Sequence, residues 1–348
     1  MRILLNKLPK NDTDKILLFY NDLKKKYSKE YKFNDECVVC GCKGFSVLGD
    51  DVIRLWNCKF YIVEKDEKLI ICDECGCIRK SYAYGADYYL EYLNNLYGVV
   101  PFGVTIQMVK KAKFRAEFIK DCFQENPRDV NSILEISSYD GVTLNYLYNF
   151  FRRKSSSDYS YPIVIGIEPT SEAVRFSIEK YPQLEGNIVN DLAENLDFNL
   201  LQFNLDVIVS SHALRMITKP KKVILGISSK VNDNAIFVVD EGSFINTTIT
   251  SMQTHQLYRQ FSQQKINYFT NHGLKYLMES NNFKFVKSMA HDSFDLQGVL
   301  LGFKSDPSIK ADEFDLKLSK TVSNFSVKFW KELQKNKKEF LYYLETVG

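Results

Sequence analysis

The middle of the chain alternates short apolar runs with longer amphipathic stretches. Five runs have the length and composition of buried strands, at 133–136, 163–167, 188–189, 206–211 and 235–239. Between them, apolar residues recur at helical spacing, with one helix ending near Tyr181 and another over 221–230. This order predicts a parallel sheet with helices on both faces, which is an α/β architecture. Sheets of this kind bind ligands at the carboxyl ends of their strands.

The end of this region departs from the alternation. Two further apolar runs, 283–289 and 296–303, are separated only by the polar stretch from Ala290 to Ser293. Because no helix lies between them, they predict an antiparallel hairpin that completes the sheet. Helices are also expected outside the alternating region, around 16–23, over 109–123 and in the Lys-rich stretch after 305.

Polar and acidic residues gather where the predicted strands end. The first strand stops at the small-residue turn from Ser137 to Gly141, and the second ends in Glu168. In a doubly wound sheet such a turn lets the backbone approach a ligand beneath a helix N-terminus, and the carboxylate accepts hydrogen bonds from a ribose diol. Asp191 follows the third strand, and Ser210 lies at the end of the fourth. The pattern indicates a cofactor that carries a nucleoside.

Length and charge narrow the class of protein. A chain of 348 residues is long enough for two or three folded units. Its net charge of +3, with both signs interspersed, argues against a nucleic-acid partner. No apolar run reaches membrane-spanning length, and the few apolar residues before Asn6 are too short a run for a signal peptide. We therefore expect a cytoplasmic protein whose cysteines stay reduced.

Four of the eight cysteines form two Cys-x-x-Cys pairs. Cys37 and Cys40 make the first pair, Cys72 and Cys75 make the second, and a glycine follows each pair. Each pair can wrap one side of a tetrahedral ion through a tight turn, and four thiolates favour zinc. We predict a structural zinc site whose ion stabilises a module too small to fold on a core of its own.

The remaining cysteines leave two interpretations open. Cys42 and Cys77 extend both pairs to Cys-x-x-Cys-x-Cys, and Cys58 lies between the pairs. They are either small buried hydrophobes or ligands of a second metal or an iron–sulfur cluster. Cys122 lies far away on a predicted amphipathic helix and is expected in the core.

Two sequence motifs resemble those of a known enzyme family. The first strand and its turn read EISSYDG, and the second strand and its end read GIEPT. Together with the cysteine pairs they resemble the zinc-binding sugar C-methyltransferases, whose motifs read roughly EIGSNDG and GIEPS. The resemblance covers about residues 35 to 305. It implies a class I S-adenosylmethionine (SAM) methyltransferase fold, Rossmann-like with an antiparallel terminal hairpin, preceded by a small zinc-binding module.

The resemblance also implies roles for single residues. The methionine end of SAM would lie against Glu135, Ser137, Asp140 and Gly141. Ser210, at the end of the fourth strand, is a further candidate for cofactor binding. Glu168 would hold the ribose hydroxyls, and Asp191 would face the adenine. The substrate would be a sugar, in the family a nucleotide-linked deoxysugar. Ser137 stands where the family has glycine.

The chain departs from the family in two places. Family members carry a Tyr-His-Glu-His run associated with deprotonation, and the matching segment before Tyr268 reads Ser262-Gln263-Gln264-Lys265. They also continue into a further α/β domain, whereas about 45 residues follow Phe303 here. The motifs that bind the cofactor are therefore present, whereas the catalytic Tyr-His-Glu-His run is not.

Several side chains remain candidates for the chemistry. His212 follows the fourth strand and would face the cofactor cleft. His255 and Tyr258 lie shortly before the altered segment and could replace the missing pair. Asp240 and Glu241 end the fifth strand, where ion pairing is an equal alternative. A tyrosine-rich stretch over 82–97 either lines a substrate pocket or packs between modules. His272, near a helix start, and His291, in the hairpin turn, are expected in ordinary exposed positions.

The sequence supports one main hypothesis and two rivals. The first is an SAM-dependent methyltransferase acting on a sugar, with C- and O-methylation both open. The second is a methyltransferase-fold partner or scaffold in glycan assembly, without catalysis. An NAD-dependent oxidoreductase is disfavoured because EISSYDG lacks the spaced glycines that approach a pyrophosphate. The expected division is a helical lead-in over 1–34, the zinc module over 35–82, the methyltransferase domain over 83–305 and a helical tail over 306–348.

Overall fold

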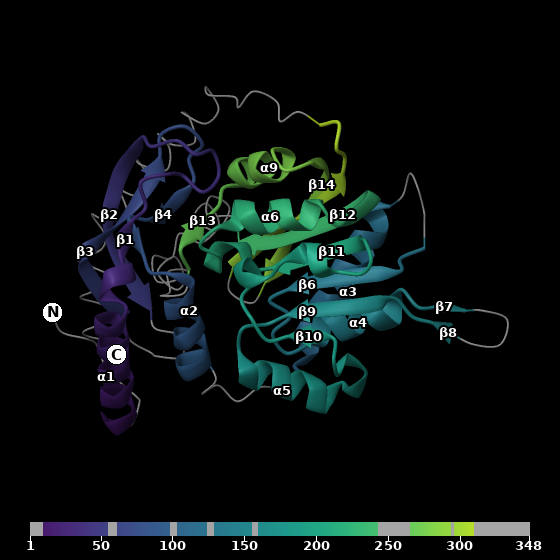
Figure 1. Cartoon of the computed structure of the whole chain (residues 1–348), viewed down its shortest axis with the longest axis horizontal. Helices are drawn as coiled ribbons and strands as arrows, with labels where there is room; N and C mark the ends of the chain where they lie inside the picture. Colours follow the sequence, from purple (N-terminus) through teal and green to yellow (C-terminus); the bar gives the residue numbers. More distant parts are fainter. Residues whose placement is uncertain are drawn as a thin grey trace.

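A seven-stranded mixed sheet forms the centre of the protein (Figure 1). The structure is a computed structural model and describes residues 10–54, 61–97, 103–123, 129–154, 159–242, 265–293 and 296–309. In spatial order the strands are β10 (Ile188–Val189), β9 (Ile163–Ile167), β6 (Ser132–Ile136), β11 (Leu205–Ser211), β12 (Val231–Gly242), β15 (Leu296–Ser305) and β14 (Phe283–Ser293). The first five are parallel, and β15 and β14 are antiparallel. This arrangement confirms the predicted class I methyltransferase sheet.

The terminal hairpin is longer than the sequence indicated. The expected polar turn from Ala290 to Ser293 belongs to β14, whose ladder with β15 continues to the pair Ser293 and Leu296. His291 is therefore in a strand, opposite Gly298, and the prediction that it lies in the turn is wrong. The polar composition of this stretch indicated a turn, although the ladder between β14 and β15 runs through it.

Helices cover both faces of the sheet and separate two hydrophobic clusters. On one face lie α3 (Ile106–Cys122) and α4 (Val142–Phe150), and on the other lie α6 (Pro220–Ser228) and α9 (Asn271–Glu279). Successive residues of β11 alternate between the clusters. Val207 and Val209 join the cluster under α3 and α4, and Ile208 joins the cluster under α6 and α9. This two-sided burial explains why these strands are apolar throughout rather than alternating.

The remaining elements connect or flank this core. They are α5 (Ser171–Lys180), the hairpin of β7 (Arg153–Lys154) and β8 (Tyr159–Ser160), and short helical turns at Ser28–Glu30, Leu93–Tyr97, Pro182–Leu184, Ala193–Asn195, Phe198–Leu200 and Leu214–Met216. In the part of the chain that the structure describes, no helix combines the length and apolar character needed to cross a bilayer.

A second sheet carries the cysteine pairs beside the main domain (Figure 1). Its strands are β13 (Asn267–Tyr268), β4 (Ile78–Lys80), β3 (Tyr61–Cys72) and β2 (Phe45–Arg54), in that order. β13 comes from the region after the fifth parallel strand, so a distant segment completes the N-terminal sheet. Cys72 and Cys75 belong to the same buried cluster as Ile208 of the main sheet. The two sheets thus share one core, and the domain boundaries drawn from the sequence stay a prediction.

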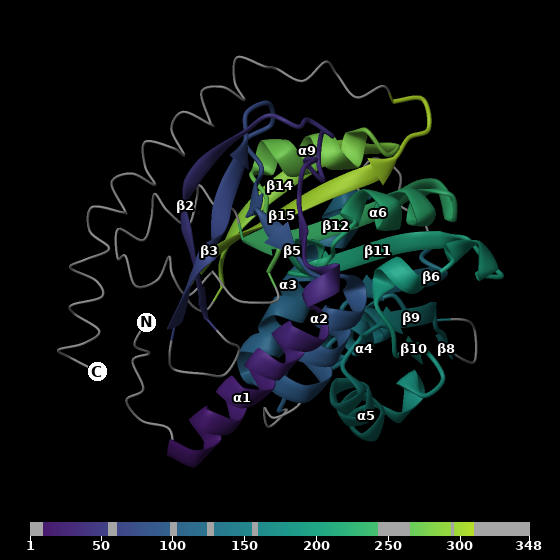
Figure 2. The same cartoon turned by 60° about the vertical axis from the view of Figure 1, so that its left-hand side comes forward.

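The tyrosine-rich stretch packs against the N-terminal helix. The helix α1 (Lys10–Lys26) lies across α2 (Ala86–Tyr92), and β1 (Lys32–Phe33) pairs with β5 (Tyr82–Ala83) (Figure 2). Tyr84 stacks on Tyr88 with ring centroids 3.9 Å apart, and Tyr88 and Tyr92 are fully buried. Most of these rings therefore serve packing, which was one of the two interpretations.

Candidate cofactor and metal sites

The turn between β6 and α4 has a backbone that few residue types adopt. Ser137, Tyr139 and Gly141 have φ angles of 60°, 47° and 71°. A Cβ on Gly141 would lie 3.0 Å from the Cβ of Ser177, so glycine is required there for space as well as conformation. The amide of Gly141 donates to the carbonyl of Ser138 at 2.9 Å and closes the turn. The first turn of α4 consequently starts at the carboxyl edge of the sheet.

Glu168 ends β9 and is held against this turn. Its two carboxylate oxygens accept hydrogen bonds from the amides of Tyr139 and Thr170, each at 2.9 Å. The side chain is 2% exposed, and burial raises the pKa of Glu168 although both amide bonds oppose the shift. Each carboxylate oxygen keeps acceptor capacity beyond its single amide partner.

Buried polar atoms without partners surround the same turn. Among the described residues, Glu135 Oε2, Asp140 Oδ2 and Ser210 Oγ are buried and form no hydrogen bond. Burial raises the pKa of Glu135 to about 8, against the nearby charge of Arg115. Such orphaned groups are rare in folded proteins and call for a ligand or water. The oxygens of Glu135 and Asp140 are acceptors that suit a cationic group. Ser210 pairs with Ile136, whereas Glu135 pairs with Val209, so these two side chains point to opposite faces of the sheet.

An apolar slot lies next to this polar turn. It has a volume of about 40 Å³ and is lined by Ile136, Ser137, Ile167, Leu192, Ala213 and Ile217, among others. Tyr89 also lines it, so one tyrosine of the 82–97 stretch does reach a pocket. Asp191, at the end of β10, is half-buried and accepts hydrogen bonds from Leu192 N and Asn195 Nδ2, both at 2.7 Å. Asp191 directly precedes Leu192, which lines the slot.

A buried arginine connects the turn to the end of β12. Arg115 donates from Nε and Nη2 to Asp240 Oδ2 at 2.8 and 2.6 Å, and from Nη1 to Thr143 Oγ1 at 2.8 Å. Arg115 and Asp240 are 7% and 1% exposed. The sequence analysis missed Arg115, although a signal existed: it shares the apolar face of its helix with Phe118, Ile119 and Cys122. A charge on that face needs a buried partner.

His212 stands beside a second buried arginine–carboxylate pair. Its backbone has φ 56° and donates to Asp240 O at 2.8 Å. Arg215 Nη2 lies 3.2 Å from His212 Nδ1, and Arg215 Nε lies 2.5 Å from Glu241 Oε2. Because a guanidinium only donates, Nδ1 is the acceptor and the ring proton is on Nε2. Burial lowers the pKa of the half-buried His212 well below its usual value, against the field of Asp240.

The four paired cysteines converge as the sequence indicated. The Sγ atoms of Cys37, Cys40, Cys72 and Cys75 all lie within 4.8 Å of one another. Cys37 Sγ is 3.4 Å from Cys75 Sγ, and Cys40 Sγ is 3.5 Å from Cys72 Sγ. In a tetrahedral zinc site with Zn–S of ~2.3 Å, sulfur atoms are ~3.8 Å apart, so the cluster could bind zinc.

Both cysteine pairs sit in matching turns. The amide of Gly41 donates to Cys37 O at 2.8 Å, and the amide of Gly76 donates to Cys72 O at 3.0 Å. Both glycines have positive φ, which closes the turn around the two sulfur atoms. The bond with Cys40 lowers the pKa of Cys37, whereas the bond with Cys37 raises that of Cys75. The four thiols are thus close enough to form hydrogen bonds with one another. A divalent ion that bound them would release their protons.

A comparison with protein-family models identifies the fold of the main domain. The model described as a methyltransferase domain matches residues 110–288, which is just over half of the chain. The chain belongs to this methyltransferase family. It is therefore an enzyme of the SAM-dependent methyltransferase class. This assignment favours the catalytic hypothesis over the non-catalytic scaffold. A search of curated proteins found no match.

Solved structures similar to the methyltransferase include three enzymes of this type. The N-methyltransferase NodS from Bradyrhizobium japonicum is 12% identical, with a TM-score of 0.40, over 58% of this chain and 98% of that one. Magnesium protoporphyrin IX methyltransferase from Synechocystis, with bound SAM, is 9% identical, with a TM-score of 0.42, over 63% of this chain and 97% of that one. An SAM-dependent methyltransferase from Clostridium acetobutylicum is 9% identical, with a TM-score of 0.41, over 63% of this chain and 98% of that one.

Several predicted residues of the methyltransferase fall outside the described part of the chain. These are His255, Tyr258, the segment from Ser262 to Gln264, Cys58 and the tail beyond 309. His272 is the second residue of α9 and is half-buried, so it is near a helix start but not fully exposed. Among the described cysteines, only the four paired ones gather within ligand distance.

The other described cysteines of the methyltransferase have local roles. Cys77 and Cys122 are buried, as expected of small hydrophobes, and burial raises the pKa of Cys122 to about 12. The half-buried Cys42 accepts a hydrogen bond from Gly44 N at 3.1 Å.

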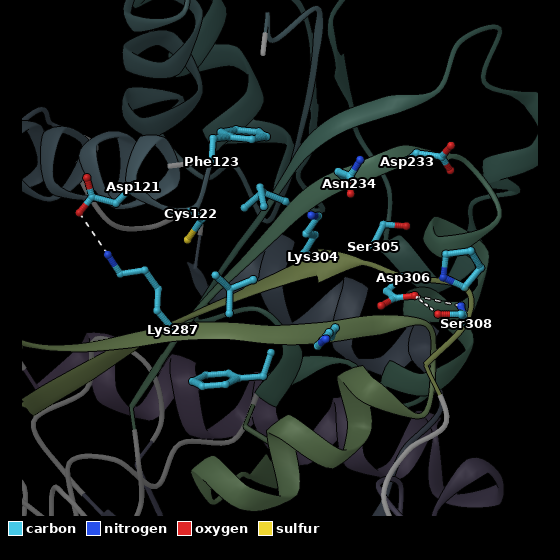
Figure 3. Close-up of a pocket in the computed structure, with 15 residues that line it drawn as sticks. Asp121, Cys122, Phe123, Asp233, Asn234, Lys287, Lys304, Ser305, Asp306 and Ser308 are labelled. Carbon is cyan, nitrogen blue, oxygen red and sulfur yellow. Dashed lines mark hydrogen bonds and ion pairs between the residues drawn. The ribbon is translucent and has the colours of Figure 1, made fainter. Parts of the chain in front are cut away.

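A wide groove lies at the opposite edge of the methyltransferase sheet (Figure 3). It has a volume of about 880 Å³ and is lined by the end of α3 and by the start of β12 and β14. Lys287 Nζ is 3.2 Å from Asp121 in this groove, and Asp306 accepts a hydrogen bond from Ser308 (Figure 3). It lies at the amino end of the parallel strands, away from the turn and Glu168, so it is not the cofactor site.

Proposed function

We propose that this methyltransferase transfers the methyl group of SAM to a carbon or oxygen of a sugar, in particular a nucleotide-linked sugar. The observation that carries the cofactor part is the position, at one sheet edge, of Glu168, an apolar slot and the orphaned oxygens of Glu135 and Asp140. The sugar part rests on the resemblance of EISSYDG, GIEPT and the cysteine pairs to the sugar C-methyltransferases.

The residues at this edge would divide the cofactor among them. Glu135 and Asp140, each with an unpartnered buried oxygen, would face the methionine ammonium. Ser210, which points to the other face of the sheet from Glu135, would border the cofactor from that side. Ser137 and Gly141 shape the turn beneath the sulfonium. Glu168 would accept hydrogen bonds from the ribose hydroxyls, and Asp191 would border the adenine. When bound, SAM supplies an activated methyl group, and the enzyme aligns the acceptor with it.

His212 would contact the acceptor as a hydrogen-bond donor. Arg215 occupies its Nδ1, so the proton is on Nε2, which has no partner among the described residues. A neutral imidazole whose pKa is lowered by burial remains a donor across the physiological range. His212 would therefore orient a sugar oxygen, and proton removal would fall to another group such as His255 or Tyr258.

The cysteine cluster would hold one zinc ion with a structural role. Four thiolates close the coordination shell and leave no open position for substrate. Because Cys72 and Cys75 lie in the main hydrophobic cluster, metal binding would stabilise the junction between the two sheets. Metal analysis of the purified protein is expected to give one zinc per chain.

Calorimetry and methyl-transfer assays test the function in two steps. The purified enzyme should bind SAM and S-adenosylhomocysteine, and Glu168→Ala should weaken both while Glu179→Ala, on the exposed face of α5, should not. Radiolabelled SAM should then transfer its methyl group to nucleotide-linked deoxysugars. Transfer to another class of acceptor, with none to sugars, would remove the substrate proposal and leave the cofactor site intact.

Substitutions of His212 test its separate role. His212→Gln retains an N–H donor and should keep much of kcat, whereas His212→Ala should lose it. If His212→Gln loses activity as fully as His212→Ala, hydrogen-bond donation is not the function of this side chain.

A further inference from the structure

Arg79 is a fully buried cation that has no carboxylate partner in the described part of the chain. It lies in β4 and is 0% exposed. Its Nη2 donates to Asn34 O at 3.2 Å, and among the described residues neither Nε nor Nη1 has a hydrogen-bond partner. No described acidic residue forms an ion pair with it, in contrast to the buried Arg115 and Arg215.

Such an arrangement is unstable unless a negative charge lies nearby. Transferring an isolated charge from water to the protein interior is strongly unfavourable, and buried charges are therefore paired or bound to metal centres. Replacing arginine by an apolar residue would remove this cost altogether. Its presence in the centre of a sheet thus points to a compensating anion.

The neighbouring strand does not provide that anion. Asn267 lies opposite Arg79 in the β13–β4 ladder and is also fully buried. Its Nδ2 donates to Ile217 O at 2.9 Å, and its Oδ1 has no partner among the described residues. An amide oxygen can accept a hydrogen bond but cannot neutralise a guanidinium.

Cys77 connects Arg79 to the cysteine cluster, because it belongs to the same buried cluster as Cys37, Cys72 and Cys75. Cys77 directly precedes β4 and is two residues from Arg79, so alternation along the extended chain places both side chains on one face. The amide of Cys72 donates to Cys77 O at 2.9 Å, so Cys77 lies directly beside one of the four paired cysteines. Asn34, whose carbonyl binds Arg79, is three residues from Cys37.

We propose that Arg79 is the buried counter-ion of a metal–thiolate centre formed by Cys37, Cys40, Cys72 and Cys75. This rests on the zinc site of the proposed function. Four protonated thiols are neutral, whereas four thiolates around a divalent ion carry two negative charges in excess. The guanidinium compensates part of that charge, and the loaded centre supplies the anion that Arg79 otherwise lacks.

The test compares zinc binding in the full-length wild type, Arg79→Met, Arg79→Lys and a matched control, Lys80→Met. Lys80 is the next residue of β4, is 1% exposed and faces the other side of the strand. Zinc affinity is measured by competition with a chromophoric chelator. Arg79→Met should bind zinc ~10–100-fold more weakly. Arg79→Lys should keep most of the affinity because it keeps the charge, and Lys80→Met should match the wild type.

The pH of metal release separates charge from packing. A cation near the thiols favours thiolate, so without it protons compete better with zinc. Half-release from Arg79→Met should therefore occur at a higher pH than from the wild type and from Lys80→Met. Arg79→Met should also lower the Tm of the zinc-loaded protein but not that of chelator-treated protein.

Three outcomes would overturn the proposal. They are equal zinc affinity in Arg79→Met and wild type, equal loss in Arg79→Met and Arg79→Lys, or equal loss in Arg79→Met and Lys80→Met. Should Arg79→Met fail to fold, Arg79→Gln replaces it, with the same expectations for affinity and release. A wild type that binds no zinc would instead contradict the metal site of the proposed function.

Discussion

Two groups of buried carboxylates at one edge of the sheet differ in how they are compensated. At the end of β12, Asp240 receives two hydrogen bonds from Arg115. At the end of β6, Glu135 and Asp140 each keep a buried oxygen without a partner. Burial is similar in the two groups, at 1%, 2% and 6% exposed. Under the proposed function, Asp240 supports the fold, whereas Glu135 and Asp140 would bind the cationic end of the cofactor.

The largest effect should come from breaking the compensated group. Arg115→Met leaves Asp240 buried without its cation and should lower the free energy of unfolding by about 3–5 kcal/mol. Arg175→Met, which breaks exposed pairs with Glu172 and Glu179 on α5, should cause no measurable change. Urea unfolding of both variants provides the measurement. Equal stabilities would mean that Asp240 is compensated by something other than Arg115.

The uncompensated group should make stability depend on pH in a definite direction. Glu135 binds its proton more tightly when folded, with a pKa of about 8 against 4.5 for the free side chain. The folded state therefore holds more protons between these values, so stability should fall as pH rises from about 4.5 to about 8 and then level off. Glu135→Gln should flatten this slope and be more stable than wild type at pH 8.

Thermal unfolding across this pH range, without SAM, tests the assignment. Glu179→Gln, on the exposed face of α5, is the control and should keep the wild-type slope. A slope unchanged by Glu135→Gln would place the titration on a different group. Because the ammonium group of SAM favours the ionised form of Glu135 in the folded protein, added SAM should lower the folded-state pKa of Glu135. The fall in stability should then level off at a lower pH.

Removing the charge of Asp140 should weaken SAM binding while leaving the folding stability nearly unchanged. Asp140 Oδ1 accepts from Val142 N at 3.1 Å, and Oδ2 is the orphaned atom. Asp140→Asn can keep the first bond while replacing the second oxygen by NH₂. Affinity for SAM should fall ~10–100-fold, as expected for loss of a charge-assisted hydrogen bond, with little change in stability.

The chain offers a close control for Asp140. Asp197 Oδ1 accepts from Asn199 N at 3.0 Å in the same two-residue pattern, but on the surface and away from the turn. Asp197→Asn should leave SAM binding unchanged in calorimetry. Equal SAM affinity in Asp140→Asn and wild type would exclude Asp140 from the cofactor site.

The smallest effect concerns the turn itself. Ser137 has φ 60°, a conformation that glycine adopts without the steric cost borne by other residues. Ser137→Gly should change the free energy of unfolding by less than ~1 kcal/mol and tighten rather than weaken SAM binding. Weaker binding in calorimetry would show that the Ser137 side chain contacts the cofactor directly.

Much of the fold follows from local pattern. The five parallel strands, the antiparallel hairpin and the two cysteine turns were all predicted, because two-sided burial and turn geometry are recorded in neighbouring residues. The end of the hairpin was not, since β14 continues through polar residues such as His291. The structure places Glu168 next to the turn from Ser137 to Gly141, as expected of residues that follow neighbouring parallel strands, and their role in a cofactor site stays a prediction.

The sequence by itself determined the order of elements and the residues at the strand ends, because each depends on its immediate neighbours. Only the tertiary structure decided which charges meet. Arg115 and Asp240 are 125 residues apart, and β13 reaches the cysteine module from a region far along the chain. Pairing over such distances depends on how sheets and helices assemble, and no local period encodes it.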